Sequence, residues 1–495
     1  MASVENEPET YDLLIIGAGP VGLATALGAL HRRVKKVLVV EQARELGQAG
    51  QPVDIFPNGT KSLQALHPEI VGKLRKSNFR GKGGGDEVGM RYVNVDGDFV
   101  EHYLDEHLKK EIRSHGMSMR WHTLQRNLVD LLPEGWLLMN HQLTDLKHDE
   151  NGKWVTAEFL ANRQRENPYV NWIPSPEERK EREESHKRNQ ESHQEARKVT
   201  LRAKVVIGAD GINSVCRRCI YRDTEGWEKY ANPNYTGLYL LSAESATYQP
   251  PESDAAVIQE QYLHKRVATP IIGRKKDVGQ ESVRIILGNA PPNLKVPGIG
   301  FTWIFNIFAA APEEFVRNSS QEEIVKHSCS LARKMGIAEE LITVFEQLPS
   351  HSDAKVAVRP LYSVPVSHPP PYRELSQSST IDYPENFYRP WSQRRAVLVG
   401  DALHGSPPFL AIGTSSGFED VADLLMRFDE AGVWNDDDID EKVLERVFKD
   451  YRDARMDRLS YLQHQTLNRL SEYDIQGMHS RRQRLYEYVP QLVKS

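Results

Sequence analysis

Three glycine-containing segments, far apart in the chain, have the residue types and spacing to hold a nucleotide cofactor. Residues 17–22 read Gly-Ala-Gly-Pro-Val-Gly, residues 208–211 read Gly-Ala-Asp-Gly, and residues 400–404 read Gly-Asp-Ala-Leu-His. Glycines let a backbone approach a phosphate closely, and carboxylates accept hydrogen bonds from sugar hydroxyls. The chemistry indicated is binding of a ligand that combines phosphates with hydroxyl groups.

The first segment has the pattern of a dinucleotide-binding turn between a strand and a helix. Gly17 permits the tight turn, Gly19 lets the backbone approach a pyrophosphate, and Gly22 lets the helix pack closely on the sheet. The pyrophosphate would lie at a helix N-terminus, where free N–H groups favour an anion. Glu41 ends the next strand at the spacing of a ribose-binding acid, with Gln42 beside it. This segment predicts a dinucleotide and leaves NAD and FAD both open.

The other two segments favour FAD. Asp210 and Gly211 follow an apolar strand at 201–208, and Asp401 follows another at 396–400. In an open parallel sheet, ligands lie beyond the carboxyl ends of the strands. A carboxylate at that edge can accept hydrogen bonds from a ribityl chain, which FAD has and NAD lacks.

Together, these GxGxxG, DG and GD motifs resemble those of the group A FAD-dependent flavoprotein monooxygenases, which have the para-hydroxybenzoate hydroxylase fold. The resemblance implies that Asp401 binds the ribityl chain, Glu41 the adenosine ribose, and Asp210 the pyrophosphate region. It implies also that Gly413 and Thr414 face the flavin ring at the start of a helix. The similar segments are roughly 10–45, 120–132, 204–217 and 397–421.

The GD loop departs from the family pattern at three positions while keeping its length. Gly405 stands where the family has a proline, Ala411 where it has a glycine, and Ser415 where it has an asparagine. Pro408 matches the family and, with His404, is a possible pocket residue. No side chain is assigned a catalytic role, because the chemistry of this family is centred on the flavin.

One further cofactor residue is implied by the resemblance. The family places an arginine near the flavin, three residues before a leucine in a helix. Arg120 lies four residues before Leu124 and is the residue we assign, with Arg126 as the alternative.

The resemblance implies a monooxygenase reaction. NADPH or NADH reduces FAD, O₂ adds at the flavin C4a carbon, and the hydroperoxide hydroxylates or epoxidises a small aromatic, polycyclic or secondary-metabolite-like substrate. A flavin-dependent halogenase, a reductase of the same fold, and a flavin-binding protein without oxygenase activity stay open as alternatives. Residues 413–417 also spell the G-x-S-x-G of hydrolases, but that serine should directly follow a strand, and here the strand ends near residue 400.

The predicted fold class is α/β. A Rossmann-like FAD-binding domain with GR2-type topology is joined to an α+β substrate domain on a mostly antiparallel sheet, followed by C-terminal helices. The expected FAD-binding domain comprises residues 9–86, 118–222 and 393–432, and the substrate-binding domain residues 87–117 and 223–392. The expected extra segments are a charged insertion at 163–198 and a helical C-terminal part at 433–495.

Composition excludes several functional classes. The chain has 495 residues, and its net charge of -6 argues against a nucleic-acid partner. The three cysteines, Cys216, Cys219 and Cys329, are too few for a disulfide framework or a four-ligand zinc site. No signal peptide is visible in residues 1–10, and the apolar residues 301–311 are too short to span a bilayer. We therefore expect a cytoplasmic monomer or homodimer without a metal or membrane anchor, whose partners are an organic small molecule and O₂.

Overall fold

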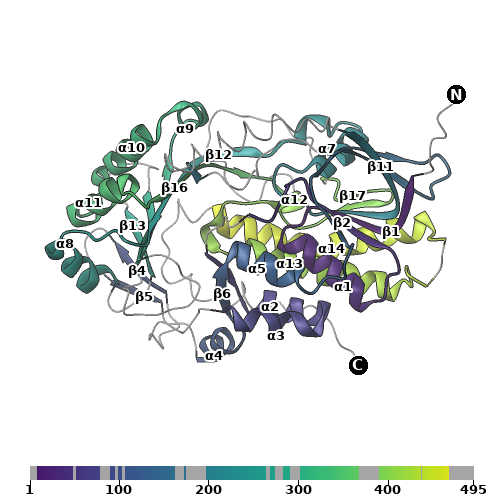
Figure 1. Cartoon of the computed structure of the whole chain (residues 1–495), viewed down its shortest axis with the longest axis horizontal. Helices are drawn as coiled ribbons and strands as arrows, with labels where there is room; N and C mark the ends of the chain where they lie inside the picture. The colour runs from purple at the N-terminus through teal and green to yellow at the C-terminus, as the bar shows by residue number, and fades with distance from the viewer. Residues whose placement is uncertain are drawn as a thin grey trace.

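Two large β-sheets organise the molecule (Figure 1). The computed structural model describes residues 8–47, 52–78, 90–94, 99–102, 106–161, 172–173, 197–263, 268–273, 283–289, 302–366, 389–435 and 438–467. We call the sheet that contains the N-terminal strand the cofactor sheet, and the other the substrate sheet. Within these ranges, no helix is both long enough and apolar enough to span a membrane.

The cofactor sheet has the strand order β17-β18-β11-β1-β2-β7, with a β8–β9 hairpin attached to β11. Its central pairs are parallel, whereas β9 runs antiparallel to β11. The strands are β1 (Glu9–Ile16), β2 (Val37–Val40), β7 (Leu137–Leu138), β8 (His141–His148), β9 (Val155–Ala161), β11 (Arg197–Gly208), β17 (Ser392–Gln393) and β18 (Ala396–Leu398).

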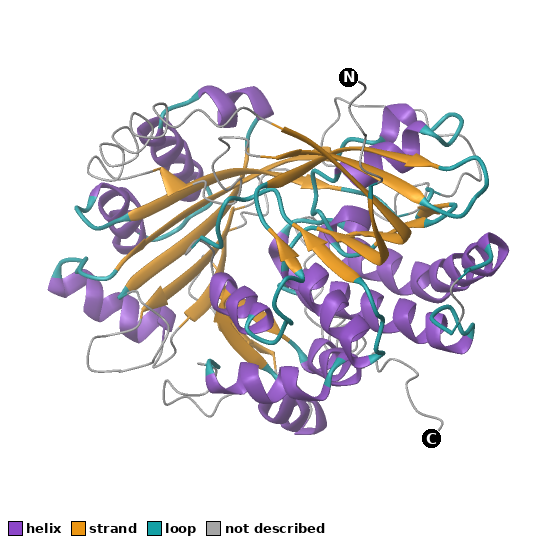
Figure 2. Ribbon diagram, turned by 45° about the vertical axis from the view of Figure 1, so that its right-hand side comes forward, coloured by secondary structure: helices purple, strands orange, loops and turns teal. Residues whose placement is uncertain are grey.

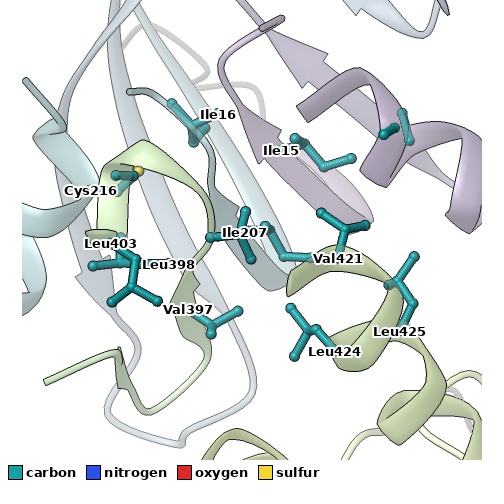
Figure 3. Packing of buried hydrophobic residues seen from close by; sticks show 14 of the residues in the cluster. Ile15, Ile16, Ile207, Cys216, Val397, Leu398, Leu403, Val421, Leu424 and Leu425 are labelled. Carbon is teal, nitrogen blue, oxygen red and sulfur yellow. The ribbon is translucent and has the colours of Figure 1, made fainter. Parts of the chain in front are cut away.

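Apolar runs explain why these strands lie at the centre. All four residues of β2 and the last four of β1 are buried, as expected for parallel strands covered on both faces. Figure 3 shows Ile15, Ile207 and Val397 packed against Val421 and Leu425 of helix α13 (Gly413–Glu430). This contact joins the sheet to the helix that begins at the predicted flavin site.

Helices surround the cofactor sheet. Helix α13 packs against α1, α2 and the long α14. The short strands β3 (Pro52–Ile55) and β6 (Met117–Arg120) pair with each other beside them. The helices of this half are α1 (Pro20–His31), α2 (Pro57–Leu66), α3 (Pro68–Lys76), α4 (Glu106–His115), α5 (Trp121–Val129), α7 (Val215–Arg222), α12 (Asp401–His404) and α14 (Glu441–Leu467).

The substrate sheet has the order β10-β16-β12-β15-β14-β13-β4-β5 and is antiparallel at every pair except β13–β4. One of its faces is covered by helices, as Figure 2 shows. The strands are β4 (Met90–Asn94), β5 (Phe99–His102), β10 (Trp172–Ile173), β12 (Asn234–Ser245), β13 (Ala268–Gly273), β14 (Val283–Asn289), β15 (Trp303–Ala310) and β16 (Lys355–Ser363). The helices are α8 (Glu252–Val257), a π-helix (Ile258–Leu263), α9 (Glu313–Asn318), α10 (Gln321–Lys334) and α11 (Glu339–Gln347).

The predicted fold class is confirmed: a mainly parallel sheet, a mostly antiparallel second sheet and a C-terminal helix are present. Within the predicted insertion at 163–198, the structure describes only four residues. Trp172 and Ile173 form β10, which pairs with β16, and residues 197–198 begin β11. The other insertion residues lie outside the described ranges. The domain boundaries stay predictions.

Candidate cofactor site

Three turns meet at one edge of the cofactor sheet. In the strand register, Ile16 of β1 lies opposite Gly208 of β11, which lies opposite Leu398 of β18. The N–H of Ala209 donates to the oxygen of Ile16 (2.8 Å), and that of Val399 donates to the oxygen of Gly208 (3.0 Å). The three motif segments predicted to act together therefore begin side by side.

The glycines of the first turn have different structural reasons. Gly17 has a φ of +103°, and a Cβ there would lie 2.5 Å from the oxygen of Ala209. A Cβ on Gly22 would lie 2.0 Å from the oxygen of Gly17, so neither position can carry a side chain. A Cβ on Gly19, which caps α1, would meet nothing within 4 Å. The protein itself leaves open space beside the N-terminus of α1, where an anion is favoured.

Glu41 is buried and ties the first turn to the end of β2. One of its carboxylate oxygens accepts from the N–H of Ala18 (2.8 Å), and the other from the N–H of Ala43 (2.9 Å). Each oxygen keeps acceptor capacity for a sugar hydroxyl. Gln42 is half-buried beside it. Gln125 on α5 donates to the oxygen of Ala18 (2.7 Å), a contact that the sequence did not indicate.

Asp210 acts on the backbone of the second turn. It accepts from the hydroxyl of Ser214 (2.5 Å) and from the N–H groups of Val215 (2.7 Å) and Cys216 (3.1 Å), so it caps α7. Gly211 has a φ of +75°. Both cysteines of the C-x-x-C pair are buried, and burial raises the pKa of the Cys216 thiol well above its usual value. These thiols are structural.

Arg217 connects the second turn to the third. Its side chain is completely buried and donates to the backbone oxygens of Ile212 (2.6 Å), Ala231 (2.9 Å) and Ala402 (2.8 Å). Burial lowers the pKa of the guanidinium to about 10. A buried cation satisfied by three carbonyl groups fixes these loops relative to one another.

The third turn places Asp401 against a helix N-terminus. Gly400 has a φ of +59°, and Asp401 opens the single turn of α12. A Cβ on Gly413 would lie 3.8 Å from the Oδ1 of Asp401. No side chain caps α13, and no acidic residue occupies its first turn, which includes the half-buried Thr414. A hydrogen-bond acceptor thus lies beside free N–H donors.

Asp401 is enclosed and accessible at once. Its side chain is exposed by surface area. Even so, burial raises the pKa of its carboxyl above the usual value; the charge of His404 opposes this rise and that of Asp420 adds to it. Both properties are expected of a carboxylate that lines a space enclosed by protein. A ligand with hydroxyl groups would fit here.

Structural contacts account for two of the three departures from the family loop, those at Gly405 and Ser415, but not for Ala411. Ala411 adopts the left-handed conformation, with φ of +53°, where the family has glycine. A Cβ on Gly405 would lie 2.9 Å from the oxygen of Asp401. Ser415 is completely buried within α13, and its hydroxyl accepts from the N–H of Phe56 (3.1 Å). Ser415 is therefore no hydrolase nucleophile.

The two possible pocket residues lie in different surroundings. His404 is buried, with its Nε2 2.6 Å from the carboxylate of Asp420. Pro408 is exposed, and the next residue, Phe409, packs its ring edge-on against Phe308 of the substrate sheet at 5.0 Å. The GD loop thus contacts both sheets.

Arg120 lies between the two halves of the molecule. Its Nη1 donates to both carboxylate oxygens of Glu244 on β12 (2.8 and 3.2 Å), and both side chains are buried. Arg126 is exposed on α5. The sequence analysis assigned Arg120 to the cofactor and did not identify Glu244. The ion pair between Arg120 and the substrate sheet was therefore not predicted.

The face of the substrate sheet that carries Glu244 is turned toward the cofactor half. Leu240 and Ser242 share this face because they alternate with Glu244 along β12, and Leu240 is paired with Phe308, which contacts Phe409. The Ser242 hydroxyl is buried and has no hydrogen-bond partner among the described residues. This face combines an apolar surface with polar groups.

Comparisons with known proteins find relatives in sequence and in fold. No protein-family model matches the chain. It is 23% identical to the FAD-dependent monooxygenase pigN of Monascus ruber, over 86% of this chain and 78% of that protein. It is 25% identical to the kynurenine 3-monooxygenase acdD of Aspergillus candidus, over 86% and 70%. The fold is similar to that of CtdE, solved in complex with FAD and a substrate, with a TM-score of 0.61 and 14% identity over 94% and 91% of the chains.

The chain is similar to FAD-dependent flavoprotein monooxygenases in sequence and in fold. This similarity supports an oxidoreductase of the monooxygenase class. The edge where the three turns meet is the candidate cofactor site.

Proposed function

We propose that this chain binds FAD at the edge formed by its three turns and uses NADPH or NADH to hydroxylate or epoxidise a small aromatic or polycyclic organic substrate. The observation that carries the proposal is the pairing of two open helix N-termini with acceptor carboxylates. Gly19 opens the space before α1, and Asp401 lies beside Gly413 at the start of α13. Asp401 and Gly413 are exposed, and Gly19 is half-buried.

The residues present fit each part of FAD. The N-terminus of α1 would hold the pyrophosphate, Glu41 the adenosine ribose and Asp401 the ribityl hydroxyls. The free N–H groups at Gly413 would lie against the electron-rich edge of the ring. When bound, FAD supplies the redox chemistry: it accepts electrons from NAD(P)H and activates O₂, so that one oxygen atom enters the substrate and the other becomes water.

The substrate would lie against the cofactor-facing side of the substrate sheet. Leu238, Leu240, Phe308 and Phe409 form a small apolar cluster there that can pack against a ring and exclude water. Ser242 offers a hydroxyl whose hydrogen bond is not satisfied by the described protein. Two relatives support a ring-bearing substrate, since one is a kynurenine 3-monooxygenase and the other a hispidin-3-hydroxylase.

Purified protein tests the proposal directly. We expect a bound flavin spectrum, and NAD(P)H oxidation that a productive substrate accelerates and that yields a product heavier by one oxygen atom. A protein that takes up no FAD would contradict the proposal. Bound FAD without oxygenated product from any substrate would favour a flavin-binding protein, and halide incorporation would favour a halogenase.

Asp401→Asn supplies the matched site variant. It keeps the shape of the side chain but removes the ionised acceptor. We expect the variant to fold and to bind FAD about tenfold more weakly, because a charge-assisted hydrogen bond is lost. Unchanged affinity would remove the role assigned to Asp401.

A further inference from the structure

A buried ionic network lies directly beneath the turn that presents Asp401. Asp420 on α13 accepts from the N–H of Gly400 (2.9 Å) and from the Nε of Arg455 (2.9 Å), and its Oδ2 lies 2.6 Å from the Nε2 of His404. Gly400 precedes Asp401 and His404 ends the same turn. The Asp420 carboxylate therefore contacts both ends of the turn formed by residues 400–404.

The same helix holds the second half of the network. Glu419 accepts from Arg455 (2.7 Å) and Arg458 (2.9 Å) of α14 and from Asn58 (2.5 Å) of α2. Arg455, Glu419 and Asp420 are completely buried. Two carboxylates and two guanidinium groups balance each other in charge. These four groups leave no positive charge to balance the carboxylate of Asp401.

His404 is placed to supply that balance. It lies three residues after Asp401 on the single turn of α12, and its Nε2 is 2.6 Å from the Oδ2 of Asp420. Although burial lowers the pKa of His404, the charge and hydrogen bond of Asp420 and the charge of Asp401 outweigh it, so the pKa is raised above its usual value. A carboxylate that lines a space enclosed by protein would be costly without a balancing charge.

The charged groups around His404 come from four elements. They are Asp401 on its own turn, Glu419 and Asp420 on α13, Arg455 and Arg458 on α14, and Arg217 on α7, which donates to the neighbouring Ala402 oxygen. The arginines already have acceptors in carboxylates or carbonyl groups. The negative charge of Asp401 would thus be balanced by a protonated His404.

We propose that His404 is a positioning residue: clamped by Asp420, it carries the proton that keeps Asp401 ionised and aimed at the N-terminus of α13. It acts on the cofactor through Asp401 and does not touch the reacting atoms. Through that one charge it sets both the affinity and the reduction potential of the flavin. This inference rests on the proposed function in so far as the ligand is FAD.

The test compares FAD affinity of the wild type and His404→Gln over about pH 5 to 9, the range in which a histidine can titrate. Glutamine can still donate a hydrogen bond to Asp420 but carries no charge. At neutral pH we expect FAD binding to weaken about tenfold in the variant, the effect of losing one charge-assisted contact. The midpoint potential of the bound flavin should become more negative, because a cation that favours the reduced, anionic form is missing.

The pH profile separates this role from a merely structural one. A raised folded-state pKa means that the His404 proton is present at lower pH and is lost as pH rises through that pKa, so wild-type affinity should fall on the alkaline side. The variant should lack this alkaline fall. Its acid-side loss, caused by protonation of Asp401, should begin at a higher pH than in the wild type.

Asp423→Asn is the matched control. Asp423 lies one turn further along α13 and pairs with Arg427 at 2.7 Å, so its loss perturbs the same helix without touching the clamp. FAD affinity, its pH profile and the potential should all stay at wild-type values. If His404→Gln lowers only the melting temperature and leaves these three quantities unchanged, the inference is overturned.

Failure of the inference and failure of the proposed function give different results. A wild-type protein that takes up no FAD would contradict the proposed function, regardless of the role of His404. If His404→Gln does not fold, the wild-type titration decides, since FAD affinity that stays constant on the alkaline side would overturn the role of His404.

Discussion

Under the proposed function, the two sheets would recognise their ligands in different ways. In the cofactor sheet the strands are apolar on both faces. The groups proposed to bind FAD are backbone N–H groups and single carboxylates, and they lie in turns at the edge of the sheet. In the substrate sheet one face is buried under helices, while the other carries groups that alternate along the strands, such as Leu240, Ser242 and Glu244. The groups proposed to bind the cofactor are therefore local in the chain, whereas those proposed to bind the substrate are spread over strands distant in sequence.

Phe305→Ala should have the largest effect and should stay within the substrate half. Phe305 is completely buried, with its ring 4.9 Å from that of Phe345 on α11. Removing it should cost about 3–5 kcal/mol of unfolding free energy, through lost burial and a cavity. Hydrogen exchange should accelerate in β12, β14 and β15, while FAD affinity changes less than about twofold. Equal acceleration in β1 and β11 would show that the two sheets unfold as one unit.

Gly22→Ala should destabilise the fold of the cofactor half and thereby abolish FAD binding. The added methyl group would lie 2.0 Å from a backbone oxygen, which cannot move as a flexible side chain could. We expect a loss of about 1–3 kcal/mol in urea unfolding and no retained FAD. Wild-type stability would mean that α1 can shift away from the first turn.

Gly19→Ala should weaken FAD binding while leaving the stability of the fold almost unchanged. Because a methyl group here meets nothing within 4 Å, unfolding free energy should fall by less than about 1 kcal/mol, the cost of a poorer helix cap. FAD affinity, measured by fluorescence titration, should still drop at least about tenfold if the backbone must approach a pyrophosphate. Unaltered affinity would place the phosphates elsewhere.

Ala411→Gly should have the smallest effect, and it should stabilise. A left-handed alanine costs about 1–2 kcal/mol, whereas the freedom that glycine adds to the unfolded chain costs about 0.4–1 kcal/mol. The melting temperature should rise slightly, with FAD affinity unchanged. A lower melting temperature would indicate that the Ala411 methyl group makes a stabilising contact.

This difference between the sheets explains what could be predicted from sequence. Each cofactor motif lies within a few residues, so the spacing of Gly17, Gly22 and Asp401 was enough to predict the turns and the edge where they meet. The Arg120–Glu244 pair joins residues 124 apart in the chain, on strands that meet only through tertiary packing. No local pattern marks such a contact.

The network under the GD turn shows the same limit at shorter range. The departure at Ala411 was visible in the sequence, but its left-handed backbone was not. Arg455 lies in a charged helical stretch that looks solvated, yet its side chain is completely buried against Asp420. Its role follows from where α14 docks, and residue types alone do not reveal that.

Close packing of α1 on α13 has a consequence for which ligands the site can accept. A Cβ on Gly417 would lie 2.5 Å from a methyl group of Val21, so the Val21 side chain packs directly against the backbone of α13. Their N-termini, which we propose to lie against the phosphates and the ring of FAD, are held at a constant separation. Only a molecule long enough to reach both gains both contributions. The proposed site would therefore select by length, and a flavin mononucleotide, which lacks the adenosine half, would not make the contact proposed at Glu41.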